Sequence, residues 1–131
     1  MSPHRSVISL VAIALGLAVV TAGCGRSGSE HSGLARTPGE AASQLDQAFA
    51  DADAEAREAA AAASEALRRQ QYETALRNLV AIETRPNVSL DQGMAVYSSM
   101  RTLEADLVAA MQAGDENAKR TYLMLKAMKR N

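Results

Sequence analysis

The sequence contains few of the side chains on which catalysis and flat-ligand binding usually depend. Its 131 residues include one cysteine, two histidines and no tryptophan, and aromatic residues make up 3% of the chain. Stacking on bases, sugars or planar cofactors therefore has little support. Lysine and arginine number 14 against 15 aspartate and glutamate, which is not the basic excess of a nucleic-acid-binding protein. We expect no nucleic-acid partner and no small-molecule substrate.

Sequence patterns typical of catalysis and metal binding are also missing. There is no glycine-rich phosphate loop and no nucleophile motif, and His31 has only Glu30 beside it. Carboxylates crowd the segment from Asp46 to Glu58, where a paired-carboxylate enzyme is conceivable but a solvated helix face is the commoner arrangement. We therefore expect a non-enzymatic protein with no catalytic residue, no metal and no noncovalent cofactor.

The N-terminal residues follow the order of a secretory signal. His4 and Arg5 precede an apolar run over residues 7–20, and small residues follow it. The run falls within the roughly 7 to 15 residues of a signal-peptide core and is shorter than the ~20 that span a bilayer as a helix. Export is therefore the prediction, and a permanent transmembrane helix is the weaker interpretation.

The single cysteine stands directly after this signal. Thr21, Ala22 and Gly23 precede Cys24, and the four residues resemble the lipobox of bacterial lipoproteins. The resemblance implies that signal peptidase II removes residues 1–23, that the Cys24 sulfur carries diacylglycerol, and that the new amino group is acylated. Two or more acyl chains anchor a protein stably to a membrane. The alternative is an ordinary signal peptide followed by a chance cysteine.

Residues 24–40 are predicted to hold the lipidated cysteine and a flexible linker. Glycine, serine and Pro38 are frequent there, and such chains behave as flexible tethers. In lipoproteins of Gram-negative bacteria an Asp after the cysteine marks inner-membrane retention, so the resemblance together with Gly25 implies an outer-membrane protein facing the periplasm. The expected location is thus the cell envelope, with residues 41–131 forming the domain at the end of the tether.

This domain is expected to be all-α. From Ala41 the composition changes to strong helix formers, with no Gly or Pro before Pro86. Ser89 and Gln92 have capping-box spacing, and Gly114 is a typical helix stop. Apolar residues from Leu90 through Met94 and Tyr97 to Met111 keep helical spacing. We predict four helices in antiparallel hairpins, over residues 41–70, 72–84, 90–113 and 116–129.

The first predicted helix carries a narrow apolar seam with steps of three and four residues. Its members are Ala42, Leu45, Phe49, Ala52, Ala56, Ala59, Ala63 and Ala66. Simple alanine-driven helix formation and a self-associating coiled coil both fit this seam. The coil would be a structural envelope lipoprotein similar in outline to the major murein lipoprotein, although this chain ends Lys129-Arg130-Asn131 and not in a single lysine.

Residues 68–86 resemble the turn and second helix of a tetratricopeptide repeat. The matching residues are Tyr72, Ala75, Leu76, Leu79, Ile82 and Pro86, with Ala59, Ala62, Ala63 and Ala66 in the place of the first helix. Gln70 or Gln71 stands where the family has a turn glycine. The resemblance implies a helical hairpin that acts as an interaction or scaffolding module. Tyr72 and Tyr97 are then candidate residues of a partner-binding groove, and core packing is the alternative for both.

Two groups of residues near the C-terminus leave alternatives open. The methionines either fill the core or line an adaptable groove: Met94, Met100, Met111, Met124 and Met128. The final residues are basic: Lys119, Arg120, Lys126, Lys129 and Arg130. These cations either stabilise a helix C-terminus or contact anionic lipid head groups, peptidoglycan or the acidic part of another copy.

Overall fold

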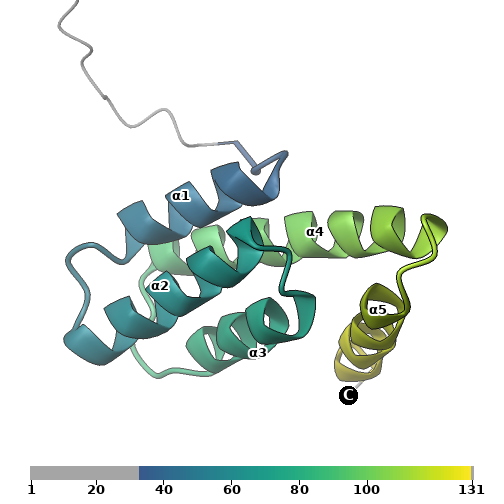
Figure 1. The fold of residues 1–131 in the computed structure, drawn as a ribbon. Helices are drawn as coiled ribbons and strands as arrows, with labels where there is room; N and C mark the ends of the chain where they lie inside the picture. The colour runs from purple at the N-terminus through teal and green to yellow at the C-terminus, as the bar shows by residue number, and fades with distance from the viewer. Residues whose placement is uncertain (1–32, 131) are drawn as a thin grey trace, which may run out of the picture.

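The computed structural model describes residues 33–130, which form five α-helices and no strand within that range (Figure 1). The all-α prediction is confirmed. The helices are α1 (Pro38–Ala48), α2 (Ala54–Arg68), α3 (Tyr72–Glu83), α4 (Leu90–Gln112) and α5 (Glu116–Met128).

The first four helices close into a ring. Each of α1, α2 and α3 packs on the helix that follows it, and α1 packs on α4 as well. The fifth helix lies outside this ring, at the far end of α4 in Figure 1, and contacts α3 and α4. The largest fully buried hydrophobic side chains come from α1 and the residue after it, α3, α4 and α5: Leu45, Phe49, Leu76, Leu79, Ile82, Leu103, Leu107 and Leu125.

The single helix predicted over residues 41–70 is wrong, because the chain reverses between Ala48 and Ala54. The Asp53 side chain accepts a hydrogen bond from the Ala56 backbone N–H at 2.8 Å and so begins a new helix. Phe49, just after α1, is almost completely buried. The reversal lets α1 and α2 pack on each other, so both halves of the alanine seam find a partner within the chain.

The residues of the predicted apolar seam lie in the core or pack against it. Ala42, Ala56, Ala63 and Ala66 are buried, and Ala52 and Ala59 are half-buried against the core. Alanine side chains bury little area, but they allow two helix backbones to approach closely. The seam is therefore used inside the monomer.

Hydroxyl groups fix the start of α1 on the neighbouring helices. The Ala35 N–H donates to Ser98 Oγ at 2.7 Å, and the Thr102 hydroxyl lies 3.0 Å from the Ala35 carbonyl oxygen. On the other side, Ser64 of α2 donates to the Ala42 carbonyl oxygen at 3.1 Å. Buried hydroxyls are stable only when bonded, and these satisfy backbone groups that would otherwise lack a partner. The helical region begins at Pro38, before the predicted start at residue 41, because the Thr37 side chain caps α1 by accepting a hydrogen bond from the Glu40 N–H.

Two helices end in the same hydrogen-bonded motif with different residues at the left-handed position. After α2, the Gln71 N–H bonds the Ala66 carbonyl and Gln70 has φ of 55°. After α4, the Asp115 N–H bonds the Ala110 carbonyl and Gly114 has φ of 91°. Both are Schellman motifs, in which glycine avoids the steric cost of a side chain. The predicted stop at Gly114 is confirmed.

We expect opposite effects from substitutions at these two ends. Gly114→Ala should lower the free energy of unfolding by about 1 to 2 kcal/mol because alanine is strained at positive φ. Gln70→Gly should raise it by about 0.5 kcal/mol by relieving the same strain. Urea unfolding of a form that starts at Gly25, followed by circular dichroism, measures both changes.

Gly93→Ala is the matched control for this pair. Gly93 lies within α4, and an added Cβ would meet its nearest neighbour, Val88, only at 4.0 Å. The same Gly-to-Ala change should there stabilise the protein by about 1 kcal/mol through helix propensity. Equal effects of Gly93→Ala and Gly114→Ala would contradict the assigned backbone strain.

Candidate functional site

The predicted lipidation site lies outside the described residues. Thr21, Ala22, Gly23 and Cys24 all precede residue 33, so lipid attachment stays a prediction from the sequence. Ala35, eleven residues after Cys24, is hydrogen-bonded to α4. Within residues 33–130, no helix is both long and apolar enough to cross a membrane.

The two tyrosines proposed for a partner groove have different environments. Tyr72, the first residue of α3, is 8% exposed and belongs to the core. Burial raises the pKa of the Tyr72 hydroxyl, and the negative charges of Asp106 and Asp115 raise it further. Tyr97 is 53% exposed on α4. Core packing thus describes Tyr72, whereas Tyr97 is available to a ligand.

Tyr97 lines a shallow groove of about 360 Å³ where α3, α4 and α5 meet. The groove floor is mostly apolar, and charged side chains stand at its rim. It is lined by Val80 and Glu83 of α3, Tyr97, Met100 and Arg101 of α4, and Leu125 and Met128 of α5 with Lys129 just after it. Tyr72 does not line it.

The sequence missed most of these residues because it assigned the wrong face of the first half of α4 to the core, although Leu103 and Leu107 further along are buried as expected. α1 approaches α4 closely, so small side chains, including Ala95 and Ser99, occupy the buried face. Met94 and Tyr97, which were expected to continue the apolar stripe, are displaced outward and are exposed. The run Ser98-Ser99 with Thr102 one turn later was the available signal, since hydroxyl residues in mid-helix often bond a neighbouring backbone.

None of the five methionines is fully buried. Met100 and Met111 pack partly against the core, while Met94, Met124 and Met128 are exposed. Core filling therefore describes these methionines only in part, and two of them, Met100 and Met128, line the groove.

An ionic contact closes one side of the groove. Lys129 Nζ lies 2.6 Å from Glu104 Oε2, and Arg101 Nη1 lies 3.5 Å from the same oxygen. The hydrogen bond from Lys129 lowers the pKa of the Glu104 carboxyl, and the charges of Lys129, Arg101 and Lys126 lower it further against partial burial. The contact ties the end of α5 to the middle of α4.

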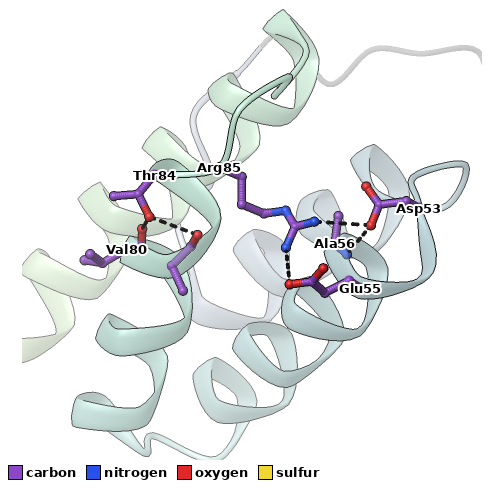
Figure 2. Close-up of polar contacts among 7 residues, drawn as sticks. Asp53, Glu55, Ala56, Val80, Thr84 and Arg85 are labelled. Atoms are coloured by element: carbon purple, nitrogen blue, oxygen red, sulfur yellow. Dashed lines mark hydrogen bonds and ion pairs between the residues drawn. The ribbon is translucent and has the colours of Figure 1, made fainter.

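Three carboxylates of the acidic segment over residues 46–58 pair with arginines far from them in the sequence. Arg85, in the loop after α3, places Nη1 2.9 Å from Glu55 Oε1 and Nη2 3.3 Å from Asp53 Oδ1, as Figure 2 shows. Arg68 lies 2.7 Å from Asp46. These carboxylates bind arginines within the chain and do not pair with the basic end of α5.

No metal site is formed by the part of the chain that the structure describes. No three His, Cys, Asp or Glu side chains converge there, and His31 precedes the described range.

The ionic contact at Glu104 makes stability depend on pH. Because the folded pKa is lowered, the contact contributes fully above the unfolded value near ~4.3 and is lost as pH falls through the folded pKa. Glu104→Gln should lower the free energy of unfolding at pH 7 by about 0.5 to 1 kcal/mol, a small value because Lys129 is partly exposed. Urea unfolding at pH 7 and pH 3 should show this difference shrinking in acid.

Glu73→Gln is the control, since Glu73 pairs with Arg77 only one helical turn away on the surface of α3. We expect it to cost no more than about 0.5 kcal/mol at pH 7. A Glu104→Gln effect that persists unchanged at pH 3 would show that the side chain acts through packing and not through its charge.

Comparisons of the chain with known protein families, with curated proteins and with solved structures find no match.

Proposed function

We propose that this protein is a lipid-anchored, non-enzymatic component of the bacterial cell envelope that binds a protein partner. The observation that carries the anchor is Cys24, the only cysteine, placed directly after three small residues and an apolar run. Only a cysteine thiolate is nucleophilic enough to accept the lipid readily. In lipoproteins of Gram-negative bacteria an Asp after the cysteine marks inner-membrane retention, so Gly25 at this position supports the periplasmic face of an outer membrane as the location.

The geometry of the N-terminal entry fits a body held close to a membrane. Ala35 is bonded to Ser98 and Thr102 of α4, so the chain joins the helical ring at a defined place. The eleven residues from Cys24 to Ala35 reach at most about 40 Å when fully extended. A lipid on Cys24 would keep the helices within that distance of the bilayer.

The groove between α3, α4 and α5 supports the binding role. Its apolar floor includes flexible methionines, and Tyr97 offers a large amphipathic side chain at its edge. Such surfaces suit a protein segment that presents apolar side chains, because methionine adapts its shape to the partner.

The alternative function, a self-associating structural coil, has less support because the surface expected to drive self-association is not exposed. The alanine seam that would drive such assembly is buried between helices of one chain. No comparable second seam was predicted from the sequence. The interaction module is therefore the function that we favour.

Cys24→Ala tests the anchor. The variant should accumulate with residues 1–23 still attached and should not incorporate a radiolabelled or clickable fatty acid, because the acceptor thiol is gone. Metabolic labelling of intact cells and the intact mass of the protein measure both effects. Ser27→Ala, three residues away, should be labelled and processed normally. Equal labelling of the Cys24→Ala variant and the parent chain would refute lipidation at this site.

The groove can be tested by photo-cross-linking in intact cells. Benzoylphenylalanine in place of Tyr97 should form a discrete adduct with one other protein, and the same probe in place of Glu65, an exposed residue of α2, should not. Met128→Lys should abolish the Tyr97 adduct by placing a charge in the groove. An adduct that survives this substitution, or one with the mass of two copies of this chain, would contradict the proposed groove.

A further inference from the structure

The fifth helix has an outward side that packs on nothing in the described structure. Ala118, Thr121 and Leu125 bury the inner side of α5. On the opposite side, Leu123 is 60% exposed, and Met124 beside it is 38% exposed. Side chains four residues apart share one side of a helix, so Leu123 and exposed Ala127 form a small second apolar surface, with Met124 at its edge. The name outer face of α5 is used below for the exposed residues Lys119, Arg120, Leu123, Met124, Lys126, Ala127 and Arg130.

Cations border this apolar surface, and three of them lack a carboxylate partner. Within residues 33–130, Arg120, Lys126 and Arg130 form no ion pair, although Arg120 contacts Asn117 and Lys126 lies 5.8 Å from the Tyr122 ring centroid. In the acidic segment over residues 46–58, by contrast, Asp46 pairs with Arg68, and Asp53 and Glu55 pair with Arg85. The positive charge of α5 is therefore available to an anion outside the chain.

We propose that the outer face of α5 lies on an anionic phospholipid surface, with Leu123 and Met124 among the head groups and Arg120, Lys126 and Arg130 at the phosphates. This pattern is that of an interfacial amphipathic helix, whose apolar side enters the head-group region while long cationic side chains reach the phosphates. At 13 residues α5 would lie along the surface and is too short to cross it. The proposal rests on the lipid anchor proposed above.

The anchor makes such a weak contact effective. A domain of about 100 residues has a radius of gyration near 13 Å, so it is roughly 35 Å across. The chain from Cys24 to Ala35 can extend about as far, which allows α5 to reach the bilayer to which Cys24 is attached. Tethering raises the local concentration of the helix at that bilayer, so the contact does not have to recruit the protein from solution.

A second copy of the chain is a poorer match for the outer face of α5. The acidic exposed surface of α2 carries Glu58 and Glu65, but its exposed apolar residues are Ala61 and Ala62. Alanine methyl groups offer little area to cover Leu123 and Met124. A phospholipid surface supplies both anionic groups and an apolar layer below them.

The contact would also orient the partner groove. Leu125 and Met128 of α5 line the groove, while Leu123 and Ala127 lie on the outer face of the same helix. With the outer face on the bilayer, the groove opens beside the membrane surface. A partner that is itself associated with the membrane would then meet the groove readily.

Hydrogen–deuterium exchange of the full chain, reconstituted into vesicles, tests the contact. One set of vesicles contains phosphatidylcholine alone and the other contains phosphatidylcholine with phosphatidylglycerol. Backbone amides of residues 119–128 should exchange at least about fivefold more slowly on the anionic vesicles, because each cation near such a surface favours the bound state about fivefold. Amides of α2 should exchange equally on both.

Matched pairs of charge removals separate a local contact from a general charge effect. The Arg120→Gln/Lys126→Gln variant should lose most of the extra protection that the parent shows on anionic vesicles, because only Arg130 of the three cations remains. Arg36→Gln/Arg57→Gln removes two exposed cations elsewhere that have no ion pair in residues 33–130, and it should retain the slow exchange. Leu123→Gln should weaken the protection without changing the charge.

Three results would overturn the proposal. The first is equal exchange of α5 on both kinds of vesicle, and the second is equal loss of protection in the two double variants. The third is protection of α5 that is the same on both kinds of vesicle but increases with protein concentration, which would indicate binding to a second copy. Intact mass of the same samples reports whether Cys24 carries lipid. The chain can attach to the vesicles through that lipid or through the uncleaved apolar run over residues 7–20. An unlipidated Cys24 would therefore contradict the anchor, whereas unchanged exchange of α5 would contradict the membrane contact.

Discussion

The close approach of α1 to α4 determines how the other helices are arranged. Ala41 and Ala42 are small enough to let the two backbones meet, and the hydroxyls of Ser98 and Thr102 satisfy the backbone of Ala35 at the entry to α1. This contact closes a ring of four helices, so a core built largely on alanine is surrounded on all sides. An alanine-rich helix alone would bury too little area to be stable.

Because small residues fill the face of α4 that packs on α1, larger apolar side chains on another face of α4 stay exposed. The larger side chains of the same helix, Met94 and Tyr97, cannot enter the narrow space beside α1 and remain exposed. The fifth helix covers only the part of α4 near Glu104, to which Lys129 is bonded. The groove beside Tyr97 follows from these two facts, and it is a by-product of tight packing elsewhere.

Local signals in the sequence were sufficient for the helix class and for several helix ends. The capping box of Ser89 and Gln92 is present as expected, and Gly114 ends α4. The break before α2 was missed because Asp53 could equally stand on a solvated helix face, and only the burial of Phe49 decides otherwise. The groove could not be predicted, because α4 has one face of small and hydroxyl side chains and another face of large apolar side chains. The periodicity of the sequence does not reveal which of these two faces another helix will cover.

The site at which the N-terminal segment joins the helices has a mechanical consequence. A pull on the chain from the N-terminal side would load the bond from Gln44 Nε2 to the Gly33 carbonyl oxygen and the two bonds between Ala35 and α4 before it reached the capped end of α1 at Thr37. These three bonds to separate side chains share the load, so the first turn of α1 is shielded from force on the preceding segment.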